Sequence, residues 1–155
     1  MGSTKKVLMK DSVSMDRKGM LRQEGDDFEV FKKEVLARKS DCKITQMAEG
    51  CRYDAVVDGN VLVEFKRRNY RSDQFKEYWI NTQKVNFLRR STIKGKKCFI
   101  ALFFSDKWFM VPVTDDETEF KYLGWKKVDN PMNGYSSEEN YGIRADQGKF
   151  YEYKC

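Results

Sequence analysis

The clearest pattern in the chain is a pair of apolar runs separated by a turn signal. The runs at 53–57 and 61–66 flank Asp58-Gly59-Asn60, where Gly and Asn tolerate the positive φ of a tight turn. The pattern predicts a β-hairpin whose turn is centred on Gly59. In that register, Asp54 lies opposite Glu64.

The predicted hairpin gathers charged side chains on one of its faces. Opposite residues of an antiparallel pair share a face, and so do residues two apart on one strand. Asp54, Glu64 and Lys66 are therefore expected to form a cluster, with Leu62 beneath it. The other face is expected to enter a core through Val61, Val63 and Phe65.

Similar patterns predict the remaining elements. Helical spacing of apolar residues predicts helices over 26–39 and from Ser72 or Asp73 to about Arg90. Apolar runs predict strands over 43–48, 97–104, 108–113 and 150–153. Further along, the sequence favours a short helix starting at 115–117, a strand or loop over 121–130, and turns at 133–137 and 141–142.

Length and composition indicate one globular domain. The chain has 155 residues, of which 40% are hydrophobic, and it contains no apolar run long enough to span a membrane. No secretory signal is visible, so we expect a cytoplasmic protein. We expect a basic N-terminal segment at 1–25, either a flexible arm or disordered. A core at 26–113 and an extension at 114–155, packed on the same domain, follow it.

The chain contains no histidine, and this excludes several kinds of chemistry. Ser-His-Asp hydrolysis and His-metal nucleases both require that residue. The four cysteines form no CxxC pair, so a zinc site is not expected and the thiols are interpreted as reduced. Any catalysis must depend on carboxylates, Lys, Tyr or a metal ion.

The opposed carboxylates of the hairpin need a positive neighbour, because two acids facing each other destabilise a sheet. Lys66 alone supplies one as a structural ion pair. A hard divalent cation such as Mg²⁺ is a second solution, since it binds carboxylate oxygens and keeps several waters. A solvated hairpin face with mixed charges is the third interpretation.

Positive charge is concentrated directly after the hairpin. The net charge of the chain is +6, yet 66–97 carry eleven Lys or Arg against two acids, giving +9 there and −3 elsewhere. Such a stripe favours a polyanionic partner, although a solubilising helix surface has the same composition.

The order of helix, strand, hairpin with Asp…Glu-x-Lys, helix, buried strand and edge strand resembles the PD-(D/E)XK nuclease superfamily. The resemblance covers Asp26 to Val113, and Gln83 to Val113 also resembles archaeal Holliday-junction resolvases. Asp54 matches the first acid, and Glu64-Phe65-Lys66 matches the (D/E)-x-K motif. Tyr53 departs from the family pattern, because a proline is frequent at that position.

The resemblance implies a fold class, a reaction and a set of site residues. The fold is α/β (α+β), with a restriction-endonuclease-like core in which helices flank a mixed central β-sheet. The activity is that of a metal-dependent endodeoxyribonuclease with Mg²⁺, for which Mn²⁺ substitutes. The implied metal ligands are Asp54, Glu64, the Phe65 carbonyl and Glu29, and the catalytic set adds Lys66 and Gln83. The residues expected to hold DNA phosphates are Arg67, Arg68, Arg71, Lys84, Arg89, Arg90, Lys94 and Lys96.

Several functions remain open at this point. A DNA endonuclease with this core resolves junctions, cleaves specific sites, or processes branched or nicked DNA. The alternatives are a non-catalytic DNA-binding module on the same scaffold, and an RNA nuclease or an inhibitor of a nuclease system. Double-strand cleavage needs two sites, which favours a homodimer formed through Trp108, Phe109, Met110 and Trp125.

Overall fold

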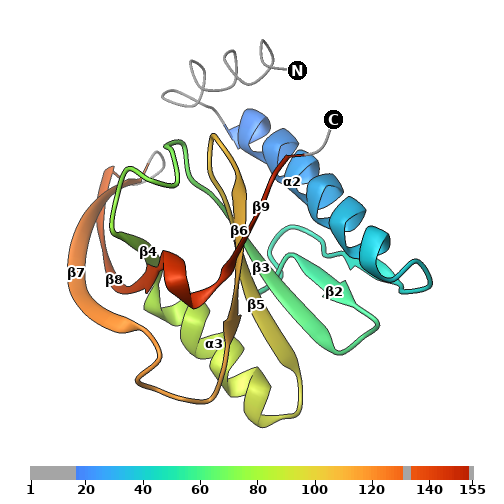
Figure 1. Ribbon diagram of the computed structural model, residues 1–155. Helices are drawn as coiled ribbons and strands as arrows, with labels where there is room; N and C mark the ends of the chain where they lie inside the picture. Colours follow the sequence, from blue (N-terminus) through green and yellow to red (C-terminus); the bar gives the residue numbers. More distant parts are fainter. Residues whose placement is uncertain (1–16, 131–133, 154–155) are drawn as a thin grey trace.

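A computed structural model describes residues 17–130 and 134–153 of the chain (Figure 1). The helices are α2 (Arg17–Arg38) and α3 (Thr82–Ile93), with a short 3₁₀ helix η2 (Ala145–Gln147). The strands are β1 (Ile44–Gln46), β2 (Ala55–Val57), β3 (Val61–Arg67), β4 (Glu77–Asn81), β5 (Lys97–Phe103), β6 (Trp108–Val113), β7 (Lys121–Asn130), β8 (Gly134–Arg144) and β9 (Lys149–Tyr151).

Two sheets organise these elements. Six strands form a mixed central sheet in the order β1-β2-β3-β5-β6-β9, in which β3 and β5 run parallel and the other neighbours are antiparallel. The order of the second, three-stranded sheet is β4-β8-β7. The expected fold class is confirmed, because a mixed central sheet is flanked by helices, consistent with a restriction-endonuclease-like core.

A separate hydrophobic core lies on each face of the central sheet. On one face, Phe28 and Phe31 of α2 pack on Val63 and Phe65. On the other, α3 and the three-stranded sheet cover the strands, and Val85, Leu88, Tyr78, Ile80 and Ile143 pack on Leu62, Ile100 and Leu102. Alternate residues of β3 therefore enter opposite cores, as the sequence predicted for Leu62 and Val63.

The register of the hairpin is confirmed. Val57 pairs with Val61, and Ala55 pairs with Val63. The turn takes positive φ values of 51° at Asp58 and 75° at Gly59, a conformation that Gly and Asp tolerate. The turn chemistry thus fixes which side chains of β3 face α3.

The predicted strand over 97–104 is also confirmed as the buried centre of the molecule. β5 lies between β3 and β6, and Ile100, Ala101, Leu102 and Phe103 are fully buried. A continuous apolar run suits a strand that is covered on both faces.

The N-terminal segment differs from the expectation. α2 begins at Arg17, so 17–25 are helical and are not a flexible arm; residues 1–16 lie outside the described part. Most residues over 17–24, namely Arg, Lys, Met, Leu, Gln and Glu, are good helix formers, which outweighs the cost of the glycines at 19 and 25.

The long helix expected to run from Ser72 or Asp73 to Arg90 is wrong in its first half. Residues 77–81 form strand β4, in which Tyr78 and Ile80 are buried while their neighbours are not. Aromatic and β-branched residues in alternation favour a strand. The helix starts only after Asn81, whose side chain accepts a hydrogen bond from the Gln83 N–H at 2.7 Å.

Two predictions for the C-terminal region are also wrong. The turns expected at 133–137 and 141–142 are replaced from residue 134 onward by β8, which pairs with both β4 and β7. The short helix expected at 115–117 is a turn, in which the Asp116 carboxylate accepts hydrogen bonds from the N–H and hydroxyl of Thr118. The strand expected over 150–153 exists as β9.

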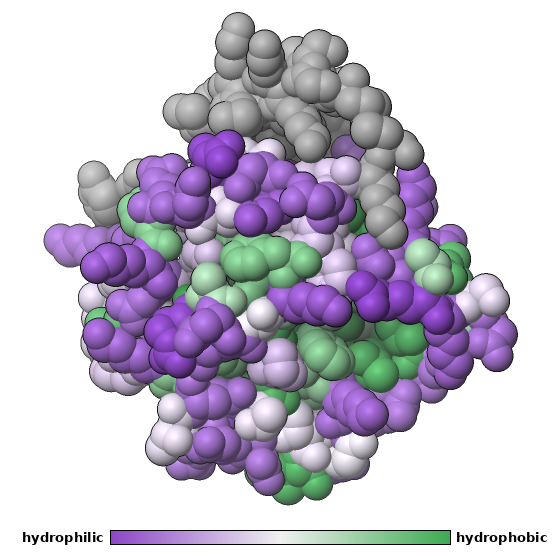
Figure 2. Space-filling view, in the orientation of Figure 1, coloured by the Kyte–Doolittle hydropathy of each residue, from purple (hydrophilic) through white to green (hydrophobic). Residues whose placement is uncertain are grey.

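The proposed dimer surface is largely internal to this chain. β9 pairs with β6 at 108–110, and Trp108 and Phe109 are fully buried. Trp108 stacks on Tyr151, so these aromatic residues complete the fold. Trp125 on β7 is 69% exposed. Figure 2 shows that the viewed face is mostly hydrophilic, with small hydrophobic patches recessed between polar side chains.

Across the described ranges, neither helix is sufficiently long and apolar to cross a membrane.

Candidate active site

The hairpin backbone holds two carboxylates on the α3 side of the central sheet. The Asp54 N–H donates to the Val63 carbonyl at 2.9 Å, which extends the β2–β3 pairing by one residue. The Asp54 carboxylate accepts a hydrogen bond from the Phe65 N–H at 2.7 Å. Asp54 is therefore held next to Glu64 by its backbone and by its side chain, as the hairpin register requires.

Both acids open into one cavity of about 390 Å³. Its walls are Asp54 directly before β2, the C-terminal half of β3, the segment at 46–51 and one side chain from α3. The charged lining residues include Asp54, Glu64, Lys66 and Lys84, and Phe65 contributes from β3. The predicted cluster of Asp54, Glu64 and Lys66 is thus brought together.

Glu64 is a deeply buried acid of this cavity. It is only 3% exposed, and its pKa is raised from 4.5 to about 7, first by burial and then by the neighbouring Asp54. The Lys84 ammonium lies 3.5 Å from the Glu64 carboxylate and, with Lys66, lowers that pKa only partly. A buried carboxylate that is incompletely compensated needs more positive charge.

The donor set fits a hard divalent cation that keeps much of its water. Among the residues that the structure describes, no three acidic or cysteine side chains gather as a complete metal cage. Asp54 and Glu64 nevertheless face the same cavity, and burial together with the neighbouring Asp54 raises the pKa of Glu64, which a bound cation would lower. Mg²⁺ is commonly held by one or two carboxylates with waters and substrate phosphate in its other positions.

Glu29 is not brought to this site. α2 packs on the Phe65 face of the sheet, whereas Glu64 faces α3. Glu29 is exposed and lines a different cavity with Asp26 and Trp108. The expectation of a metal ligand on the first helix is wrong for Glu29, because the helix covers the opposite face.

At the start of α3, Lys84 and not Gln83 lines the cavity. Gln83, expected among the catalytic residues, lies in the first turn, is exposed and does not line the cavity. Lys84, expected to hold a phosphate, instead forms an ion pair with Glu64. Asn81 is the sequence signal that could have predicted the position of Lys84. As the N-cap it fixes where α3 starts, and the start of the helix determines which side chains face the sheet.

The arginines at the end of β3 and directly after it have structural partners. Arg67 forms an ion pair with the buried Asp27 of α2. Arg68 donates to the Trp79 carbonyl at 2.6 Å, and Arg71 contacts Asp73 and Asp106. Arg67 and Arg68 therefore have structural partners within the chain, and their phosphate contacts stay a prediction.

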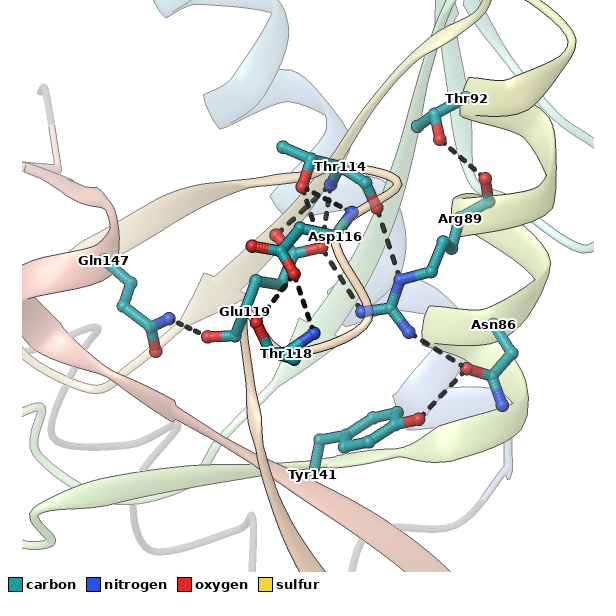
Figure 3. Close-up of polar contacts among 9 residues, drawn as sticks. All are labelled: Asn86, Arg89, Thr92, Thr114, Asp116, Thr118, Glu119, Tyr141 and Gln147. Carbon is teal, nitrogen blue, oxygen red and sulfur yellow. Dashed lines mark hydrogen bonds and ion pairs between the residues drawn. The ribbon is translucent and has the colours of Figure 1, made fainter.

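Arg89 is likewise a structural residue, and its contacts are drawn in Figure 3. The guanidinium is buried and contacts the Glu119 carboxylate at 3.3 Å and the Thr114 carbonyl at 3.3 Å. The Glu119 carboxylate also accepts a hydrogen bond from the Thr114 N–H. The backbone carbonyl of Glu119 accepts one from the Gln147 side-chain amide. Arg89 thus joins α3 to the loop between β6 and β7.

The end of α3 and the loop that follows it carry the exposed members of the expected DNA-binding set. Arg90, Lys94 and Lys96 are exposed, and the Lys96 ammonium donates to the Gly59 carbonyl at 2.9 Å. Near the cavity, Arg52 is a cation that the sequence interpretation missed. Its guanidinium lies 5.2 Å above the Phe87 ring, directly before the Tyr53-Asp54 pair.

Replacing Arg89 with Ala is expected to lower the free energy of unfolding by about 3 kcal/mol, because Glu119 is left without its buried partner. Urea denaturation measures this change. Arg90→Ala removes an exposed arginine from the next position and is expected to change stability by less than about 0.5 kcal/mol. Equal losses in the two variants would contradict the structural role of Arg89.

Comparisons with known proteins give a distant structural likeness. No protein-family model matches the chain, and no curated protein matches it. Among solved structures, it is similar to Hjc of Archaeoglobus fulgidus, a Holliday junction resolvase from an archaeal hyperthermophile. The identity is 16% and the TM-score 0.45, over 76% of this chain and 93% of that chain. Because the likeness is distant, the residues of the cavity carry the functional argument.

Proposed function

We propose that the protein is a metal-dependent endodeoxyribonuclease that hydrolyses phosphodiester bonds at the cavity of Asp54, Glu64 and Lys66. The observation that carries the proposal is the buried Glu64 carboxylate, whose pKa is raised to about 7 beside a second acid in an open cavity. Strongly perturbed acids cluster at catalytic sites, and a buried acid beside a second acid is costly to ionise unless a cation is bound.

Asp54 and Glu64 would hold the ion, with the Phe65 carbonyl as a further oxygen ligand. When bound, Mg²⁺ or Mn²⁺ supplies Lewis acidity toward the scissile phosphate and lowers the pKa of the attacking water. The Phe65 N–H fixes the Asp54 carboxylate by its hydrogen bond, so this ligand is oriented before the substrate arrives.

The two lysines of the cavity have different partners. The Lys84 ammonium offsets the charge of Glu64 and holds its carboxylate in the cavity wall. Lys66 belongs to the same β3 face as Glu64 and lines the cavity, where it would place positive charge beside the phosphate oxygens. Charge develops on those oxygens as the water oxygen bonds to phosphorus and the bond to the leaving oxygen breaks.

The decisive experiment uses the full chain with supercoiled plasmid and with a four-way DNA junction, each with Mg²⁺ and with EDTA. Nicking or cleavage that requires Mg²⁺ supports the proposal and shows which DNA structure is preferred. Binding of either DNA without cleavage in Mg²⁺ would instead favour the non-catalytic DNA-binding module.

We expect Arg52 to contact a DNA phosphate beside the cavity. Each phosphate that the protein neutralises contributes roughly −0.9 to the slope of log affinity against log salt concentration on duplex DNA. Arg52→Ala is therefore expected to flatten the slope by about one, measured by fluorescence anisotropy in EDTA.

Arg38→Ala provides the matched control. Arg38 is an exposed arginine that also lies over an aromatic ring, but it belongs to α2 on the other face of the sheet. Its slope should equal that of the wild type. A slope that changes with Arg38 and not with Arg52 would place the DNA on the α2 face.

A further inference from the structure

A second cavity, which the proposed chemistry does not use, lies beyond the C-terminal end of β3. Its volume is about 420 Å³, within the roughly 300–1,000 Å³ of small-ligand sites. Its lining combines aromatic rings with hydrogen-bonding side chains. The residues are Arg68, Tyr70, Phe75, Glu77, Trp79, Lys126, Glu138 and Asn140.

One aromatic ring of this cavity is exposed to solvent and a second is half-buried. Phe75 is 51% exposed although it lies on the Tyr70 ring, with centroids 4.8 Å apart and an interplanar angle of 87°. Trp79 is half-buried on the outer face of β4, since Tyr78 and Ile80 take the inner face. The Lys126 ammonium lies 4.8 Å from the centroid of the Trp79 ring, and Lys126 itself is exposed.

The polar groups of the cavity match the edge of a nucleobase. Glu138 and Asn140 lie two apart on β8 and therefore on one face of the strand. A carboxylate accepts from the amino group of a base, and a carboxamide both donates and accepts. The Asn140 amide nitrogen donates to the Glu138 carbonyl at 3.1 Å, which fixes the carboxamide in the buried floor.

β3 connects this cavity to the carboxylate site. The Arg68 N–H donates to the Phe103 carbonyl at 2.9 Å, so the strand ladder continues one residue past β3. Glu64, Lys66 and Arg68 therefore alternate along one face, with Cα atoms roughly 6.6 Å apart at each step. The hydrogen bond from Arg68 to the Trp79 carbonyl ties β4 to that end of the strand.

We infer that this cavity binds one unstacked nucleobase of the DNA substrate, next to the nucleotide whose phosphate lies at Asp54 and Glu64. Phe75 and Trp79 stack on the base, and Glu138 and Asn140 hydrogen-bond its edge. Lys126 leaves the Trp79 face when the base enters. The inference rests on the proposed function for the identity of the ligand as DNA, and it makes unpaired or flipped bases the preferred substrate feature.

The test measures binding in EDTA, so that it does not depend on cleavage. The probes are a short duplex with one bulged 2-aminopurine, whose fluorescence reports stacking, and the same duplex with an abasic bulge. The full chain is expected to bind the bulged base about tenfold more tightly than the abasic bulge and to change the 2-aminopurine emission.

Two variants and one control separate the cavity from the rest of the sheet. Phe75→Ala removes an exposed ring and is expected to abolish most of the tenfold preference, as is Trp79→Ala, whose folding is checked by thermal denaturation. Trp125→Ala removes an exposed tryptophan that does not line the cavity and should keep the preference. Equal affinity for the two bulges, or an equal loss in Trp125→Ala, would overturn the inference.

The same set of measurements keeps the two proposals distinct. A chain that prefers the bulged base yet fails to cleave DNA with Mg²⁺ contradicts only the proposed catalysis. A chain that cleaves with Mg²⁺ yet treats both bulges alike contradicts only the base-binding cavity.

Discussion

Replacing Lys66 with Ala is expected to slow DNA cleavage about 100- to 1,000-fold, the usual loss when one preorganised charge is removed from an active site. The physical reason is the position of Lys66 on the same strand face as Glu64, at the cavity where the phosphate would lie. DNA affinity in EDTA should fall by less than about fivefold, because a single phosphate contact is lost among several.

Single-turnover cleavage with enzyme in excess separates these two effects, because it measures the chemical step after DNA is bound. Lys76→Ala is the matched control: Lys76 is an exposed lysine in the loop before β4 and does not line the cavity. Its cleavage rate should equal that of the wild type. Wild-type cleavage by Lys66→Ala would refute the proposed role of this side chain.

Replacing Glu64 with Gln is expected to remove cleavage and metal binding while stabilising the metal-free protein at pH 8. The amide has nearly the shape of the carboxylate but no charge, so a cation loses one of its two acidic ligands. The same change relieves the buried charge. A pKa raised from 4.5 to about 7 corresponds to about 3 kcal/mol when the group is ionised in the folded state.

The direction of the pH dependence follows from the raised pKa. Between pH 4.5 and about pH 7, the folded protein keeps a proton on Glu64 that the unfolded chain has released. The contribution of Glu64 to stability is therefore complete below pH 4.5 and is lost as the pH rises through 7. Glu64→Gln should exceed the wild type by about 2–3 kcal/mol at pH 8 and by much less near pH 5.

Two measurements test the prediction for Glu64. Urea denaturation in EDTA at pH 5 and at pH 8 gives the stability difference, and calorimetric titration with Mn²⁺ gives metal binding. Glu29→Gln serves as control, because Glu29 lies at a different cavity and should bind metal like the wild type. If Glu64→Gln binds Mn²⁺ unchanged, or Glu29→Gln loses binding, the metal site is placed wrongly.

Local signals explain the parts of the site that could be predicted from the sequence. The Asp58-Gly59 turn fixes the hairpin register, and the register in turn places Asp54 beside Glu64 and Lys66. The buried run of β5 likewise needed no distant information, because a strand covered on both faces is apolar throughout.

The errors arise where partners far apart in sequence decide the outcome. Arg67 pairs with Asp27 and Arg89 pairs with Glu119, across 40 and 30 residues, so a basic run in the sequence is not a basic surface in the fold. The apolar residues of the segment at 77–81 fit both the spacing of a helix and the alternation of a strand, and pairing with β8 makes the segment a strand. The placement of α2 on the Phe65 face, which excludes Glu29, depends on packing alone.

The alternation of β3 has a consequence for how this protein tolerates insertions and deletions. Glu64 and Lys66 face α3, while Val63 and Phe65 face α2, so each neighbouring pair belongs to opposite sides of the sheet. A one-residue insertion between the turn at Gly59 and Glu64 would exchange the two sides, placing Phe65 in the cavity and Glu64 against Phe31. Length changes in related chains are therefore not expected between 59 and 66. Changes of activity in related chains are therefore expected to arise from substitutions along β3, because a one-residue change of register there disrupts the core and the cavity together.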